Sequence, residues 1–164
     1  MHDFADIYDR YFARVYNYAR YRVGDAVAAD DVVSRVFEKA LDRLDAFDPE
    51  RGRLDAWLFA IARSAIVDHF RGRRPPGPSL DAAEGLPDGK PRIEERLERE
   101  EASRGLLRAL DRLDERSREL LALKFGARMT NRAIAESTGL GESNVGVLAH
   151  RAVRTLQSAL AEKP

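Results

Sequence analysis

The residues whose types and spacing most clearly fit a chemical task lie in one C-terminal stretch, residues 131–145. Ile134 faces inward on a short helix, and Gly139 supplies the positive φ with which that helix ends. Leu140 fills the corner, and Val145 belongs to a second helix that packs on the first. This pattern predicts a helix-turn-helix, a unit that presents its second helix to the major groove of DNA.

Two sets of side chains from this unit are expected to meet DNA. The outward residues of the second helix can reach base edges by hydrogen bonds, by apolar contact or through the shape of the DNA. These residues are Ser143, Asn144, Val147 and His150. The phosphate backbone is the expected target of Arg128, Thr130, Asn131, Arg132, Arg151 and Arg154. For Arg151 an alternative role as a cap within the domain stays open.

A loop at residues 47–53 and the start of the helix that follows it form a second candidate DNA site. Separated strands need cations for the backbone and a pocket for an unstacked base. Arg51 and Arg53 supply the charge, and Gly52 permits a close approach. Trp57 is either a stacking platform or a core residue, and its position in an apolar stripe favours the core.

A basic cluster follows near the end of the next predicted helix. It consists of Arg63, Ser64, Asp68, Arg71, Arg73 and Arg74. The arginines at 71, 73 and 74 either complement a helix C-terminus or contact phosphates, and their clustering favours phosphates.

The sequence contains no arrangement that is typical of an active site. It has no cysteine, and His2, His69 and His150 lack ligand spacing, so we predict no metal site and no cofactor. We find no nucleophile–base pair, phosphate-binding glycine loop or carboxylate dyad, and we therefore do not expect an enzyme. Acids near the N-terminus and the lack of a long apolar run favour a cytoplasmic protein with no membrane insertion.

The periodicity of apolar residues predicts an all-α fold. Residues 4–19, 27–44 and 54–70 carry apolar stripes at three- and four-residue spacing, and nothing has the alternation of a strand. Three such stripes can bury one another in a bundle of three to four helices. Further leucines precede the helix-turn-helix, so the C-terminal part is expected to be a four-helix domain.

Charge and turn residues divide the chain into three parts. The formal net charge of the whole chain is +0, which argues against a protein that simply coats DNA. Residues 1–74 are balanced, residues 75–102 carry a net charge of −4, and residues 103–164 carry +4. The middle part is rich in proline and glycine, which predicts a flexible acidic linker between two domains, with a helix able to begin near Glu94.

Four segments together resemble one family, the two-domain extracytoplasmic-function (ECF) group of bacterial RNA polymerase sigma factors. The third segment lies at the family's usual distance after the second, and the fourth runs on into the helix-turn-helix. The segments are Ala29–Phe37 (ADDVVSRVF), Ala56–Arg63 (AWLFAIAR), Asp68–Arg71 (DHFR) and Arg118–Phe125 (RELLALKF). The resemblance implies that residues 1–74 are similar to sigma region 2 and residues 103–164 to sigma region 4.

The resemblance also implies partners and a division of labour. The RNA polymerase core would be contacted at its β′ clamp helices and its β flap, and the second helix would dock on the clamp helices. The docking residues would be Asp31, Ser34, Arg35 and Glu38, although composition alone describes them as a solvated helix face. The loop and third helix would recognise and open the minus-ten promoter element, and the C-terminal domain would bind the minus-thirty-five element. Ser64 departs from the family's usual Asn, whose bidentate contacts a serine cannot make.

Several alternatives remain at this stage. One is a stand-alone helix-turn-helix regulator, which would bind palindromic operator DNA as a dimer without polymerase. Another is a nucleic-acid enzyme, which is disfavoured because the sequence has no metal-binding or nucleophilic arrangement of residues. Chains of this kind are usually held inactive by an anti-sigma factor, which is an expected partner. Alternatively, the two domains close on each other when the chain is free.

Overall fold

The computed structural model describes residues 3–72 and 93–162, with side chains for 3–72 and 101–162. These residues form helices and contain no strand, which confirms the predicted all-α fold. Two short turns interrupt the helices, a 3-10 turn η1 (Leu44–Ala46) and a π-helical turn η2 (Ala122–Gly126). The helices are α1 (Phe4–Val23), α2 (Ala26–Arg43), α3 (Leu54–Gly72), α4 (Ile93–Asp111), α5 (Glu115–Leu121), α6 (Asn131–Thr138) and α7 (Glu142–Ala161).

Local capping fixes the ends of the first two helices. The Asp3 carboxylate accepts a hydrogen bond from the Ala5 N–H at 3.3 Å and so begins α1. Gly24 ends α1 with φ 73°, and its N–H donates to the Arg20 carbonyl at 2.8 Å. Asp25 follows directly and caps α2. The break between the first two helices is therefore a C-cap, Gly24, joined to an N-cap, Asp25.

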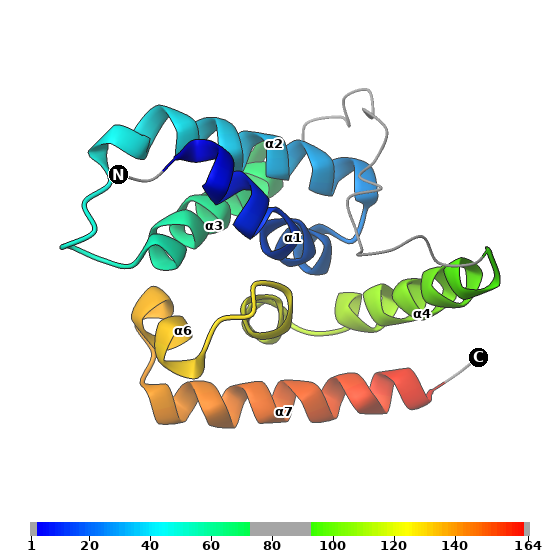
Figure 1. The fold of residues 1–164 in the computed structure, drawn as a ribbon. Helices are drawn as coiled ribbons and strands as arrows, with labels where there is room; N and C mark the ends of the chain where they lie inside the picture. Colours follow the sequence, from blue (N-terminus) through cyan, green and yellow to red (C-terminus); the bar gives the residue numbers. More distant parts are fainter. Residues whose placement is uncertain (1–2, 73–92, 163–164) are drawn as a thin grey trace.

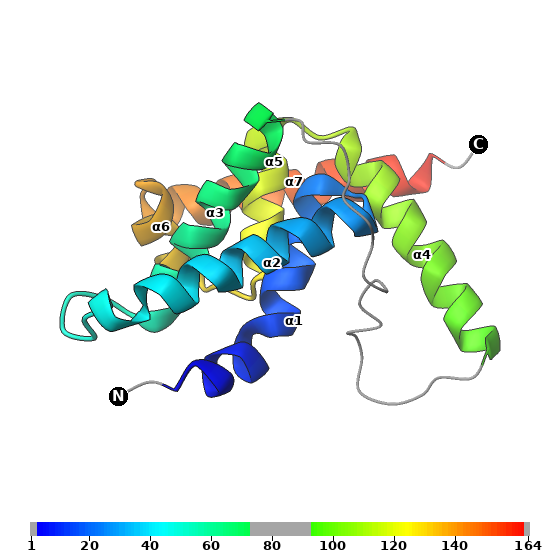
Figure 2. The same ribbon diagram turned by 90° about the horizontal axis from the view of Figure 1, so that it is seen from above.

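The helices α1, α2 and α3 form the N-terminal bundle. Figure 2 shows α2 crossing α1, with α3 beside it. Each helix buries most of its predicted apolar stripe, with Val15, Val36 and Leu58 fully enclosed. The Tyr18 ring meets the Phe59 ring edge-on at 6.0 Å between centroids, which ties α1 to α3. The loop between α2 and α3 is thus held at one end of a packed bundle.

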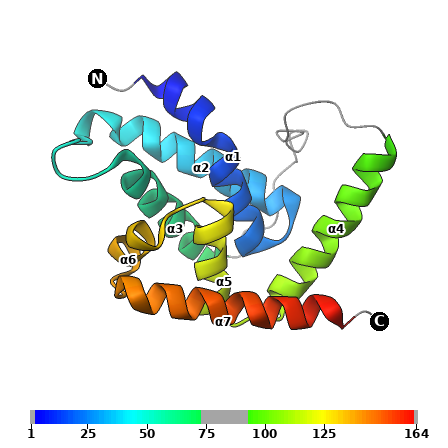
Figure 3. The ribbon, with the colours of Figure 1, turned by 60° about the horizontal axis from the view of Figure 1, so that its bottom comes forward.

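The C-terminal unit contains the predicted helix-turn-helix. The Asp114 carboxylate begins α5 by accepting a bond from the Ser117 N–H at 2.7 Å, which lowers the pKa of Asp114. Thr130 caps α6, and Gly139 ends it in the left-handed region at φ 80°. In Figure 3, α7 runs along the edge of the unit beneath α5 and α6.

The two parts pack against each other in a closed arrangement. Figure 1 shows α1, α2 and α3 in one layer and α4, α6 and α7 below them, with η2 directly under α1. One hydrophobic cluster runs through both layers, from Val36 through Tyr18 to Leu123 and Ile134. Of the two arrangements left open by the sequence, the structure therefore has the closed one.

The contact between α1 and η2 is close because Gly126 has no side chain. A Cβ at Gly126 would lie 2.9 Å from both the Cα and the N of Tyr18, and 3.1 Å from the carbonyl carbon of Asn17. Real Cβ atoms essentially never lie within 3.0 Å of a neighbouring atom, so the two contacts at 2.9 Å exclude a side chain here unless the backbone shifts. Gly126 therefore permits the two backbones to meet, as glycine does where chains approach closely.

Some predicted boundaries and core positions differ from the structure. The helix expected to begin near Glu94 is α4, which starts at Ile93 and so includes residues 93–102 of the segment assigned to the linker. Residues 75–92 lie outside the described residues. Leu41, Phe70 and Phe125 belong to predicted apolar stripes yet are 53%, 43% and 50% exposed. For Phe125 the reason is η2, where the Ala127 N–H bonds to the Ala122 carbonyl and the wider turn shifts the stripe by a residue.

Candidate nucleic-acid and protein interfaces

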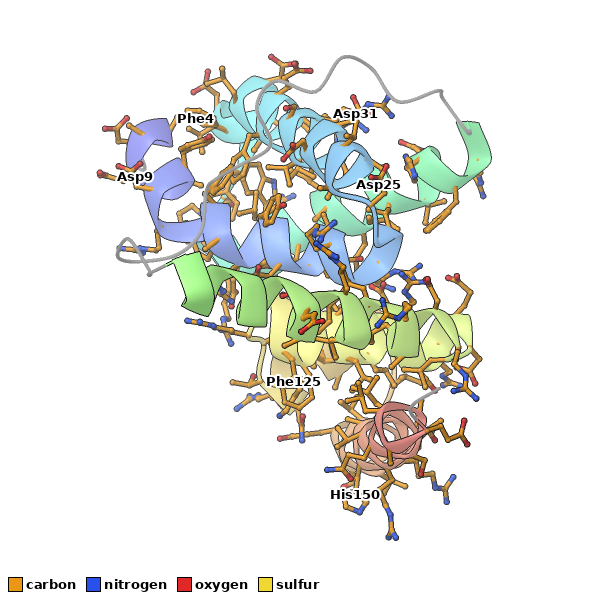
Figure 4. All side chains as sticks on the ribbon, turned by 90° about the vertical axis from the view of Figure 1, so that its right-hand side faces the viewer. Phe4, Asp9, Asp25, Asp31, Phe125 and His150 are labelled. Carbon is orange, nitrogen blue, oxygen red and sulfur yellow. The ribbon has the colours of Figure 1, made fainter. Side chains whose placement is uncertain are left out.

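The outer face of α7 has the geometry of a recognition helix. Val145 is fully buried and fastens the start of α7 to the unit. Ser143, Asn144, Val147 and His150 are all exposed, as predicted for residues that reach base edges. In Figure 4, His150 points away from the rest of the molecule. This face is open to a partner even in the closed arrangement.

The predicted phosphate-binding residues of this unit fall into two groups. Arg128, Arg132, Arg151 and Arg154 are exposed. Arg128 has φ 57°, a left-handed conformation that side chains rarely adopt. The other group makes internal bonds, because the Thr130 hydroxyl caps α6 and the Asn131 side-chain oxygen accepts a bond from Lys124 at 2.7 Å. The four arginines therefore lie on the surface of the unit, whereas Thr130 and Asn131 are engaged in bonds within it.

An open pocket of about 530 Å³ lies at the loop between α2 and α3. Arg51, Gly52 and Arg53 line it, as expected for the candidate melting element. Arg53 is paired with the buried Asp55 carboxylate at 2.7 Å, whereas Arg51 has only a loose pair with Asp48 at 3.7 Å. The arrangement joins a concave surface to partly available cations, which is what an unstacked base and its phosphate require.

The aromatic residues that line this pocket do not include Trp57, for which the sequence favoured a core position. Tyr11 and Phe47 line the pocket, and Trp57 does not. Trp57 is half-buried against the core, with its ring 5.0 Å from that of Phe47. The core alternative for Trp57 therefore describes its position better than the stacking alternative. Sequence reasoning missed Tyr11 because it lies on α1, far along the chain from the loop.

Some residues of the basic cluster on α3 are exposed, and one is bonded to the C-terminal unit. Ser64, Asp68 and Arg71 are exposed, and Asp68 pairs with Lys39 of α2 at 3.3 Å. Arg63 instead faces the C-terminal unit, where its Nε lies 3.1 Å from Glu119. The predicted residues Arg73 and Arg74 lie outside the described residues.

The predicted polymerase-binding residues share the outer side of α2. Ser34 and Glu38 are exposed, while Arg35 and Asp31 form an ion pair at 2.9 Å along the helix. Figure 4 places Asp31 on the opposite side of the molecule from His150. Asp30 does not belong to this outer face, since its Oδ2 atom is buried without a hydrogen-bond partner. Burial raises the pKa of Asp30.

The described part of the chain has neither a cluster of metal-binding side chains nor a membrane-spanning helix. Among the side chains of residues 3–72 and 101–162, no group of three or more His, Cys, Asp or Glu could hold a metal ion. No helix in these ranges is long and apolar enough to cross a membrane.

Both halves of the chain match models of known protein regions. Residues 7–75 match the model described as Sigma-70 region 2, and residues 103–156 match the model described as Sigma-70, region 4. The matches occur in this order and together leave out mainly the segment between the domains.

Two curated relatives carry the same group name. The chain is 34% identical over 162 residues to the ECF RNA polymerase sigma factor BldN of Streptomyces coelicolor, with 96% of this chain and 60% of that protein covered. It is 37% identical over 112 residues to the ECF RNA polymerase sigma factor RpoE of Cereibacter sphaeroides, with 68% and 59% covered. The chain thus spans about 60% of the length of these two relatives.

Two solved structures are similar over nearly the whole chain. The structure of CnrH in complex with the cytosolic domain of CnrY has a TM-score of 0.69 and 28% identity, and the match covers 98% of this chain and 89% of that one. The sigma factor RpoE of Bartonella quintana, in complex with the anti-sigma factor NepR, has a TM-score of 0.71, with 99% of each chain covered. Its identity is 20%, so this second likeness concerns the fold alone.

Proposed function

Because the chain belongs to the extracytoplasmic-function group of bacterial RNA polymerase sigma factors, we propose that it directs core polymerase to specific promoters and helps to open the DNA there. The observation that carries the proposal is the presence of both sigma regions, in order, on one chain. A stand-alone operator-binding regulator is not favoured, because it would give region 2 no task.

The minus-ten element is the proposed ligand of the N-terminal bundle. The pocket beside Arg51 and Arg53 is a concave surface at the end of a rigid bundle, and the exposed Arg71 extends the cationic surface along α3. Binding an unpaired base there offsets part of the free energy needed to separate the strands. The protein makes and breaks no covalent bond in this role.

The minus-thirty-five element is the proposed ligand of the C-terminal unit. Ser143, Asn144 and His150 offer hydrogen-bonding groups on the exposed face of α7, and Val147 offers an apolar contact to a thymine methyl. The exposed arginines around this face supply phosphate contacts, which position the helix without reading sequence.

Polymerase and an inhibitory protein are the proposed macromolecular partners. The Asp31, Ser34, Arg35 and Glu38 face of α2 would dock on the β′ clamp helices, and the C-terminal unit would meet the β flap. CnrH was solved with a bound protein partner, and its similarity to this chain supports an anti-sigma factor as a further partner. These activities place the protein in the cytoplasm, where polymerase acts.

Run-off transcription is the direct test of the proposed function. Purified chain and core polymerase are incubated with a pool of promoter DNA fragments, and start sites are mapped by sequencing the transcripts. We expect discrete start sites only when both proteins are present. Core polymerase that initiates identically with and without the chain would refute the proposal.

A charge reversal tests the docking face separately. Glu38→Lys should weaken binding of the chain to core polymerase by roughly tenfold, since like charges at a docking surface are strongly unfavourable. Asp9→Lys is the matched control, because Asp9 is also an exposed acid but lies on α1. Affinity is measured by fluorescence anisotropy of the labelled chain, and equal losses in both variants would count against the α2 face.

A further inference from the structure

Several side chains of α3 are predicted to contact DNA. Among those that the structure describes, only Arg63 is bonded to the C-terminal unit. Its Nε donates to Glu119 on α5 at 3.1 Å, and its Nη1 donates to the backbone carbonyl of Ser137 on α6. The Arg63 guanidinium, which is proposed to bind DNA phosphate, is thus already hydrogen-bonded to a carboxylate and a backbone carbonyl. Arginine pairs with carboxylate and with phosphate through the same planar fork, so the two partners compete.

Glu119 is the centre of a larger contact between the domains. The Tyr18 hydroxyl donates to its carboxylate at 2.9 and 3.0 Å, and Arg22 lies 2.7 Å from it. Arg22 is buried at 7% side-chain exposure and also bonds Glu115 of α5 at 2.8 Å. The N-terminal bundle therefore presents two arginines and a phenol to carboxylates of the C-terminal unit. Buried charges of this kind are strongly dependent on their partners.

Backbone contacts hold the same interface from both sides. Arg14 of α1 donates to the Ala127 carbonyl at 2.6 Å, and Arg118 of α5 donates to the Tyr21 carbonyl at 2.6 Å. Gly126 lets η2 approach the Tyr18 backbone between these bonds. The interface combines charge, hydrogen bonding and shape, so it is a specific contact between the domains.

The closed arrangement cannot engage both promoter elements at once. About 25 base pairs separate the two elements, which is roughly 85 Å at about 3.4 Å per base pair. A compact chain of this length has a radius of gyration of about 15 Å. The closed chain is too short to span that distance, so α5 must leave α1 and α3 before both DNA surfaces are used.

From these contacts we propose that the closed arrangement is a self-inhibited state, in which Glu119 occupies Arg63 in place of DNA phosphate. Opening of the chain then frees Arg63 and separates the two DNA-binding units in one step. The role of Arg63 in DNA binding rests on the proposed function, whereas the closure itself does not.

Closure can be measured on the full chain by energy transfer between two dyes. The chain has no cysteine, so Asp9→Cys and Gln157→Cys provide two unique labelling sites on exposed residues of α1 and α7. We expect high transfer efficiency in the free chain. Addition of core polymerase and promoter DNA should lower it.

Two variants in this labelled background open the chain by different physical means. Glu119→Gln removes the charge that pairs with Arg63 and Arg22, and Gly126→Ala places a methyl group against the Tyr18 backbone. Each should shift the equilibrium between closed and open chains by roughly tenfold or more toward open. Glu136→Gln is the matched control, because Glu136 pairs only loosely with Arg132 inside the same unit, at 3.6 Å.

Run-off transcription with the chain limiting supplies the second measurement. Glu119→Gln and Gly126→Ala should raise transcript yield roughly threefold to tenfold, in line with the larger open population. Circular dichroism checks that each variant keeps its helices. Because the two variants act by charge and by shape, failure of one to fold leaves the other as the test.

The outcomes separate the inference from the proposed function. Low transfer efficiency in the unmodified chain, or no change in either folded variant, overturns the closed state. Lower transfer with unchanged or reduced transcript yield overturns self-inhibition while sigma activity stands. Lower transfer with no transcript from any chain, the unmodified one included, refutes the proposed function and with it the inhibitory role assigned to Glu119.

Discussion

The N-terminal bundle and the C-terminal unit differ in how much of their core each supplies for itself. The bundle buries three apolar helix faces against one another. The C-terminal unit has a small cluster of its own, built on Leu110, Leu121 and Ala152. Its other buried residues, Leu123 and Ile134 among them, join the cluster that continues into the bundle.

This difference indicates that closure stabilises the C-terminal unit more than the bundle. A domain of about 60 residues buries only about 60% of the surface of its unfolded chain and is marginal by itself. The C-terminal unit is of that size, and the bundle covers part of its apolar surface. Opening therefore exposes apolar groups of the unit, which polymerase and DNA would have to cover again.

A cavity at the shared core tests this comparison most severely. Leu123→Ala should lower the free energy of unfolding by about 2–5 kcal/mol, because the side chain is fully buried between the two parts. The chain should still unfold in one transition in guanidinium, followed by circular dichroism. Leu160→Ala, at an exposed position near the end of α7, should change it by about 0.5 kcal/mol or less. Two separate transitions, with only one shifted by Leu123→Ala, would show that the cores are independent.

Backbone geometry at the helix-turn-helix sharpens the comparison within the C-terminal unit. Gly139→Ala should destabilise the chain by about 1–2 kcal/mol, since φ 80° is unfavourable for a residue with a Cβ. Gly105→Ala, inside α4 and without a close neighbour, should instead stabilise it by about 0.5–1 kcal/mol. Thermal unfolding should show a lower melting temperature for Gly139→Ala and a higher one for Gly105→Ala. Equal effects would mean that the turn does not constrain φ.

A third substitution separates DNA affinity from stability. Arg128→Gly removes a candidate phosphate contact and also relieves the left-handed backbone at φ 57°. We expect unchanged or slightly higher stability, together with weaker promoter binding by the polymerase complex. The slope of the logarithm of the binding constant against the logarithm of salt concentration should fall by about one. Arg112→Ala, in the turn after α4, should leave the salt dependence as it is, because Arg112 pairs with Glu162 at the far end of α7 at 2.8 Å. Loss of stability without loss of affinity would contradict the prediction.

The smallest effect is expected at Asp30 in the N-terminal bundle. Burial raises its pKa, so the folded state favours the protonated form, and the ionised form present at neutral pH destabilises the fold. This destabilisation is absent below the ordinary pKa and complete above the raised one. Asp30→Asn should therefore raise the melting temperature at pH 7 by up to about 2 °C, and by less as the pH falls toward 4. A lower melting temperature at pH 7 would point to an unrecognised bond to the carboxylate.

Much of the local structure was predictable because it depends on neighbours in sequence. The helix stripes, the break at Gly24 and the left-handed Gly139 follow from spacing and from glycine's freedom. The exposure of Phe125 was not predictable, because the π-helical turn that rotates it away arises from packing on α1. Tyr11 was missed as a pocket residue for a related reason, since α1 brings it to the loop only after the bundle folds.

The sequence by itself determined the all-α class and the helix-turn-helix, and it suggested the surfaces that we propose for DNA and polymerase, since periodicity, capping and turn residues act over a few positions. Only the tertiary structure decided that Arg63 meets Glu119, that η2 rests on α1 through Gly126, and that one core serves both parts. The physical reason is that such contacts join residues far apart along the chain. They form only where the closed packing brings complementary charge and shape together.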